Sequence, residues 1–118
     1  MQGDFNVMTL NARGLRNPVK RRSIFFIFLK IKIVKLISPR YSELCDETIW
    51  RSEWGGVIFF SHRSTHSKGV CILMNPSLNC TFDNLQKDQN GRIVSVDLSL
   101  SGSKFSSCNI YVPNDQRI

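Results

Sequence analysis

The 118-residue sequence lacks the features that mark several specialised classes of protein. Its four cysteines form no C-x-x-C pair, which argues against the common zinc and dithiol sites. It has no long apolar run either, because lysines interrupt the apolar segment 23–37 and leave far less than the roughly 20 residues that span a bilayer. Repeats, low-complexity tracts and linkers are missing, so we expect one domain over residues 1–118.

No secretory leader precedes Asp4, and scattered cysteines are typical of proteins that stay reduced. We therefore expect an intracellular protein, nuclear or cytoplasmic, that is neither secreted nor held in a membrane.

Acidic side chains are scarce: 9 Asp and Glu stand against 16 Lys and Arg, which gives a formal charge of +7. This balance favours a polyanionic partner such as DNA, although excess charge also serves solubility. A non-catalytic basic nucleic-acid-binding module is therefore one functional hypothesis. It depends on cations near one end of the expected fold, namely Lys20, Arg21, Arg22, Lys30 and Arg40.

Hydrophobic patterning predicts a helix over Val19–Leu29, entered through Asn17-Pro18, with Lys20, Arg21 and Arg22 on its wet side. The strand predicted over Lys30–Ile37 alternates at first, and its pattern breaks at Val34. Asn90-Gly91 and Ser101-Gly102 fit hairpin turns. The other expected strands are Asp4–Leu10, Gly56–Ser61, Gly69–Met74, Cys80–Leu85, Arg92–Leu100 and Phe105–Val112.

This order of elements favours an α+β sandwich in which helices cover largely antiparallel sheets. The chain lacks the regularly alternating helices of a doubly wound parallel sheet. Its predicted helix is also too short to supply two complete covering layers.

Polar residues follow two of the predicted strands. Asn11 ends the first strand, where its side-chain amide could contact a metal through the oxygen or a phosphate through the N–H groups. Tyr111 and Asn114 stand where the last strand meets a proline-defined loop, and the tyrosine hydroxyl could bind a phosphate. Taken alone, each residue also fits a purely structural role. Asn11 could end a strand at a turn, Tyr111 could be a sheet tyrosine with a solvent-exposed hydroxyl, and Asn114 could be a turn residue.

Four segments together resemble the endonuclease domain of LINE-type, non-LTR retrotransposons, a branch of the endonuclease/exonuclease/phosphatase superfamily that includes exonuclease III and DNase I. They follow the family's order along nearly the whole chain. The segments are Asn11–Pro18, Ile49–Gly56, Gly69–Leu73 and Asn109–Asp115.

This resemblance implies the N-terminal part of such a domain, with a partial four-layer α/β/β/α sandwich of the DNase I-like type. It also implies DNA as partner and Mg²⁺-assisted phosphodiester hydrolysis at the strand ends. A metal would offset the charge that develops in the transition state. By position, Asn11 matches the active-site Asn that faces the metal, while Tyr111 and Asn114 match the family's Tyr-x-Pro-Asn element.

Two departures from the family predict that the chain does not cut DNA by itself. The metal-binding Glu is expected near Pro39, and proline has no side-chain oxygen to offer. Glu43 would replace it only if the intervening loop were rebuilt, and a compensated frameshift over Val34–Tyr41 could account for the loss. The family's later Asp, Asn and His residues have no counterpart before Ile118, and His62 and His66 are interpreted as loop residues. A third hypothesis is a poorly folded remnant without a biochemical role.

Overall fold

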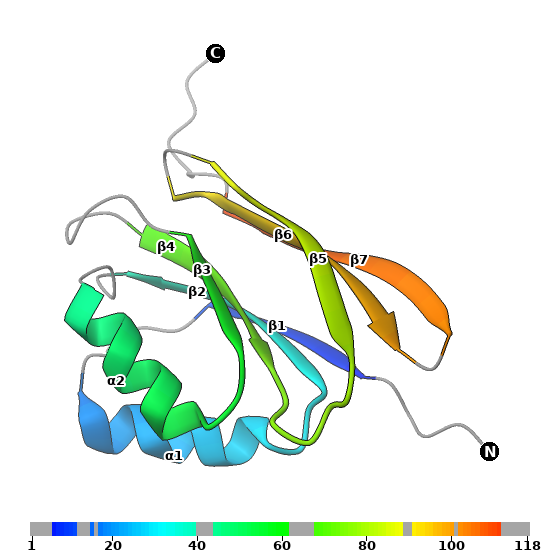
Figure 1. Cartoon of the computed structure of the whole chain (residues 1–118). Helices are drawn as coiled ribbons and strands as arrows, with labels where there is room; N and C mark the ends of the chain where they lie inside the picture. Colours follow the sequence, from blue (N-terminus) through cyan, green and yellow to red (C-terminus); the bar gives the residue numbers. More distant parts are fainter. Residues whose placement is uncertain are drawn as a thin grey trace.

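The structure is a computed structural model that describes residues 6–11, 15, 17–39, 44–61, 68–88, 91–100 and 102–111. Within these ranges the chain forms two helices and seven strands (Figure 1). In chain order they are β1 (Val7–Asn11), α1 (Pro18–Phe28), β2 (Ile33–Pro39), α2 (Leu44–Trp54), β3 (Ile58–Ser61), β4 (Lys68–Met74), β5 (Thr81–Lys87), β6 (Ile93–Leu100) and β7 (Ser103–Ile110).

The strands form two sheets. The first has the order β1-β2-β4-β3, in which β1 and β2 are parallel and the other pairs are antiparallel. The second is the antiparallel meander β5-β6-β7. Gly91 and Gly102 lie in its two connections with φ of 71° and 83°, a region that glycine adopts without strain, so the expected hairpin positions are confirmed.

Two apolar clusters hold the layers together. One joins both helices to the first sheet and includes Phe25, Trp50 and Leu36. The other joins the two sheets and includes Ile72 and Val96. The first sheet therefore lies between the helices and the second sheet, as Figure 1 shows.

The expected four-layer α/β/β/α sandwich of the DNase I-like type is wrong. Just over half of the described residues (51%) lie in strands, and both helices pack on the same face of the first sheet. In the described ranges no helix covers the outer face of the second sheet. The physical reason is that alternation places polar residues on that face, which suits water better than a packed helix. They are Asp83, Ser95, Asp97, Ser99 and Ser106.

Strand β2 shows why the pattern seemed to break at Val34. Ile33 belongs to the cluster between the sheets, whereas Val34 and Leu36 belong to the cluster beneath the helices. All three side chains are buried, because β2 is covered on both faces. Its register with β1 and β4 continues without a shift from Ile33, so the break in alternation at Val34 does not interrupt the strand.

Helix α1 begins as expected at Asn17, whose Oδ1 accepts hydrogen bonds from the main-chain N–H groups of Val19 (2.9 Å) and Lys20 (3.2 Å). The expected exposure of Arg21 is wrong, because its side chain is buried against Glu53 of α2. Helix α2 itself was not predicted. Neither helix is long and apolar enough to cross a membrane, as far as the described residues go.

Candidate functional site

Three strands that carry or precede the expected site residues run toward the same end of the molecule, at the left of Figure 1: β1, β2 and β7. Asn11 is the register partner of Ile37, which places the ends of β1 and β2 side by side. Near the end of β7, Asn109 donates a hydrogen bond from Nδ2 to the main-chain oxygen of Leu36 at 3.0 Å. The three strand ends therefore lie close together.

Asn11 is exposed, and alternation determines the face on which it lies. Met8 and Leu10 pack against the cluster beneath the helices. Val7, Thr9 and Asn11 consequently occupy the opposite face of β1, the side on which the second sheet lies, and all three are exposed. The amide of Asn11 is thus accessible at the strand end.

Tyr111 directly follows β7 and is half-buried against the cluster between the sheets. Its main-chain N–H donates to the oxygen of Arg92 at 2.8 Å, which holds it beside the start of β6. Asn11 and Tyr111 therefore lie on the same side of the first sheet and at the same end of the molecule. Asn114 lies outside the described residues, so its position in the expected site stays a prediction.

Asn109 is a buried residue that sequence reasoning did not single out. Its Nδ2 donates to the main-chain oxygens of both Leu36 and Cys71, at 3.0 and 2.9 Å. The sequence does carry one signal for its burial: alternation along β7 places Asn109 on the inward face together with Phe105 and Ser107. The role visible here is to join the two sheets directly beneath Tyr111.

The described donors do not fit a Mg²⁺ site. Pro39 ends β2 opposite Lys68 and brings no side-chain oxygen to the place where the family Glu is expected. Asn11 supplies a single amide oxygen. In the ranges that the structure describes, no group of three or more His, Cys, Asp or Glu side chains is placed to hold a metal ion. Glu43, His62 and His66 lie outside those ranges.

The expected basic cluster is smaller than its sequence indicates. Arg21 donates to both carboxylate oxygens of Glu53 and, through Nη1, to the main-chain oxygen of Leu15 at 2.9 Å, so these contacts occupy its guanidinium group. Lys20, Arg22 and Lys30 are exposed. They lie on or just after α1, across the first sheet from Asn11, while Arg40 lies outside the described residues. The basic surface of α1 and the expected site at Asn11 are thus on different faces of the first sheet.

Trp50 and Trp54 are 1% and 3% exposed, so both pack in the core and neither offers a stacking surface to bases. Phe25 meets both rings edge-on, at centroid distances of 5.7 and 5.6 Å. Cys71 is fully buried, and burial raises the pKa of its thiol. These residues build the core of the helix-covered layer, not the site.

No protein-family model matches the chain. The chain is similar to the "Transposon TX1 uncharacterized 149 kDa protein" of Xenopus laevis, with 27% identity over 109 residues. The match covers 92% of this chain and only 8% of that relative. The chain is therefore similar to a small part of a transposon protein, a finding that supports the expected origin in a retrotransposon.

Proposed function

We propose that the chain is part of a retrotransposon nuclease domain that handles the DNA phosphate through Asn11, Tyr111 and Asn114 and does not cleave DNA by itself. The observation that carries the proposal is the common location of Asn11 and Tyr111. Both residues follow or end strands that finish at one end of the molecule, on the same side of the first sheet.

The chemistry of these groups supports holding a phosphate more than cutting one. An amide N–H and a tyrosine hydroxyl donate hydrogen bonds to phosphate oxygens. Hydrolysis also requires compensation of the negative charge that builds up in the transition state, usually by a metal held by carboxylates. Among the described residues, no group of three or more His, Cys, Asp or Glu side chains is placed to hold such a metal.

The first part of the proposal, that Asn11 and Tyr111 contact the DNA phosphate, is tested by titrating the chain with a short DNA duplex and following the NMR spectrum. Asn11 and Tyr111 resonances should shift, and Asn11→Ala and Tyr111→Phe should each weaken affinity about tenfold, since each removes a hydrogen bond to a charged group. Asn79→Ala is the matched control, because Asn79 is an exposed Asn outside the strands. Equal DNA affinity of Asn11→Ala and Asn79→Ala would refute the proposed contact between Asn11 and the phosphate.

A plasmid-nicking assay with Mg²⁺ tests the second part of the proposal, that the chain does not cleave DNA by itself. We expect the wild-type chain and Asn11→Ala to leave the plasmid equally intact. Turnover by the wild-type chain that disappears in Asn11→Ala would show an active nuclease and overturn this part of the proposal.

A further inference from the structure

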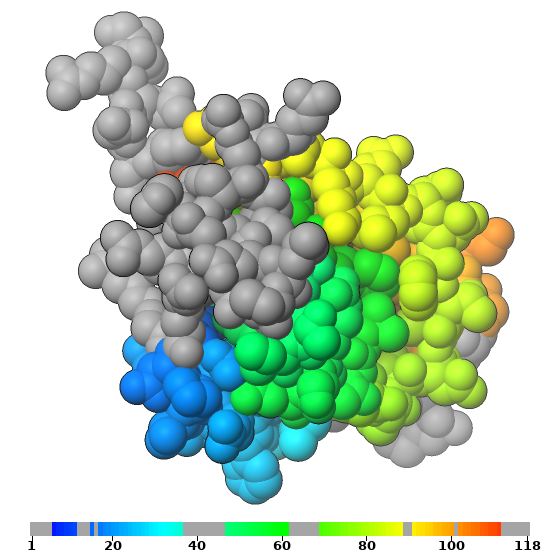
Figure 2. Space-filling view, turned by 60° about the vertical axis from the view of Figure 1, so that its left-hand side comes forward, coloured from blue at the N-terminus to red at the C-terminus, as the bar shows by residue number. Residues whose placement is uncertain are grey.

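The outer face of helix α1 exposes large apolar side chains. Figure 2 brings α1 (blue) and α2 (green) forward, side by side on one face of the molecule. Val19 and Phe26 are each 71% exposed, and Ile27 is 56% exposed. An exposed apolar patch of this kind marks an interaction surface more often than a single exposed apolar residue does.

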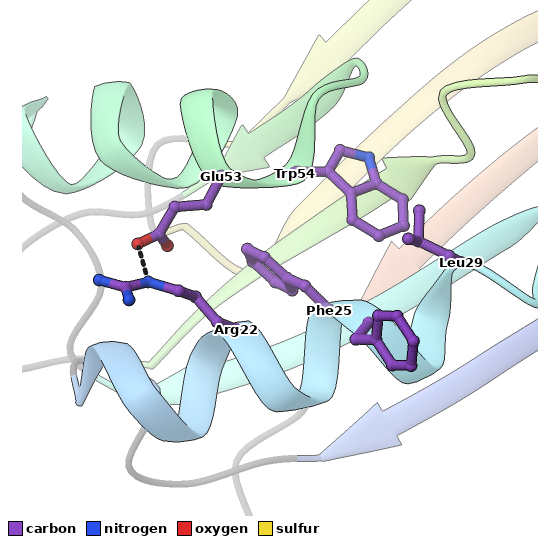
Figure 3. A pocket seen from close by; sticks show the side chains of 6 residues that line it. Arg22, Phe25, Leu29, Glu53 and Trp54 are labelled. Atoms are coloured by element: carbon purple, nitrogen blue, oxygen red, sulfur yellow. Dashed lines mark hydrogen bonds and ion pairs between the residues drawn. The ribbon is translucent and has the colours of Figure 1, made fainter.

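A groove of about 260 Å³ runs between α1 and α2 beside this patch (Figure 3). Its floor is apolar and buried, formed by Phe25 and Trp54, whose rings meet edge-on at 5.6 Å. Its rim is formed by exposed Phe26 and Leu29. The groove is therefore a concave apolar slot open to water.

Charge distinguishes one end of the groove. Arg22 donates from Nε to Oε2 of Glu53 at 3.2 Å, yet 64% of its side chain remains exposed. The same carboxylate accepts two hydrogen bonds from Arg21, so one negative charge is shared between two guanidinium groups. This end of the groove keeps net positive charge, and α1 itself contains no acidic residue.

We propose that the groove between α1 and α2 binds an amphipathic helix of a partner protein whose apolar face is bordered by acidic side chains. An apolar side chain of that helix inserts between Phe26 and Leu29 above Trp54, and a neighbouring carboxylate pairs with the exposed end of Arg22. This proposal does not depend on the nuclease proposal, because the groove lies across the first sheet from Asn11.

The shape and the charge favour this occupant over others. A second copy of the chain would bring the cations of one α1 against those of another, which is unfavourable. DNA phosphates would meet Arg22 and leave the apolar slot unfilled. A flat bilayer surface would cover Val19, Phe26 and Ile27 but would likewise leave the slot between the helices unfilled, whereas a side chain projecting from a partner helix fills it.

The test uses the whole 118-residue chain and a labelled, designed helical peptide with leucines on one face and glutamates beside them. We expect binding by fluorescence anisotropy that weakens about tenfold in Arg22→Gln and in Phe26→Ser. Ile110→Ser is the control, because Ile110 is 53% exposed on β7, away from the groove. It should bind like the wild-type chain, and circular dichroism should show all three variants folded.

Four results would overturn the proposal. The same peptide with lysines in place of glutamates could bind equally well, or Ile110→Ser could weaken binding as much as Phe26→Ser. The chain could bind anionic vesicles or duplex DNA but not the peptide, and Phe26→Ser could abolish that binding. Sedimentation could show a dimer that Phe26→Ser abolishes, which would identify a second copy as the occupant.

Discussion

The side-chain amide of Asn109 donates a hydrogen bond to the main-chain oxygen of Leu36, 73 residues earlier in the chain. A second bond from the same Nδ2 reaches the oxygen of Cys71 at 2.9 Å. Leu36 and Cys71 are register partners on β2 and β4, so one side chain of the second sheet is fixed to two strands of the first. The bond to Leu36 therefore ties the second sheet to the strand that pairs with β1, at the register position next to that of Asn11 and its partner Ile37.

We expect Asn109→Leu to lower the free energy of unfolding by about 1–3 kcal/mol, because a buried polar contact is lost while the volume is nearly kept. Urea denaturation measures the change. Cys108→Ser is a matched control on the adjacent, outward-facing position of β7 and should stay close to wild type. Equal stability of Asn109→Leu and Cys108→Ser would show that the amide does not hold the sheets together.

Much of the secondary structure could be predicted because local pattern determines it. The predicted helix Val19–Leu29 differs from α1 by one residue at each end, since the Asn17-Pro18 entry is a purely local signal. Alternation with turn residues likewise predicted the hairpins of the second sheet. These elements depend on contacts between near neighbours in the sequence.

The errors arise from contacts between residues far apart in the chain. Arg21 looked exposed among Lys20 and Arg22 because its partner, Glu53, is 32 residues away. Strand β2 looked interrupted because burial on both faces removes alternation. Helix α2 had a signal in the four-residue spacing of Trp50 and Trp54, which places both on one helix face.

Gly56 is predicted to be intolerant of a side chain. A Cβ there would lie 2.7 Å from the main-chain oxygen of Met74 and 3.0 Å from Nε1 of Trp54. These two atoms are joined by a 2.8 Å hydrogen bond, so neither can move freely. Gly56→Ala should cost about 1–3 kcal/mol and shift Trp54 fluorescence. Ser52→Ala, on an exposed position of α2, should change neither, and a fully stable Gly56→Ala would contradict the close packing.

Asp97 is predicted to titrate below the usual Asp value. Its carboxylate accepts hydrogen bonds from Oγ of Ser106 at 2.6 Å and Nδ2 of Asn84 at 2.8 Å, and these bonds lower its pKa. Ser106→Ala should raise that pKa toward the usual value, as followed by NMR titration of the carboxyl carbon. Ser95→Ala, on the same face of the sheet, should leave the pKa of Asp97 unchanged. An unchanged Asp97 pKa in Ser106→Ala would exclude the hydroxyl as its cause.

Glu53 should make the fold sensitive to acid. The hydrogen bond from Arg21, aided by Arg22, lowers the pKa of Glu53 below its usual value of 4.5, although burial opposes the shift. A carboxyl with a lowered pKa in the folded state stabilises the fold above its unfolded pKa, and this stabilisation is lost as pH falls through the folded pKa. Wild-type stability should therefore decline below about pH 4.5 with a component that Glu53→Gln lacks.

At neutral pH the same substitution leaves the buried Arg21 without its carboxylate, so Glu53→Gln should lose about 3 kcal/mol in urea denaturation. Arg22→Gln is the matched control: its side chain is 64% exposed, and its loss should cost less than about 1 kcal/mol. The free energy of unfolding of each protein is compared with its own value at neutral pH. If it changes in the same way for wild type and Glu53→Gln between pH 6 and pH 3, Glu53 is not the acid-sensitive group.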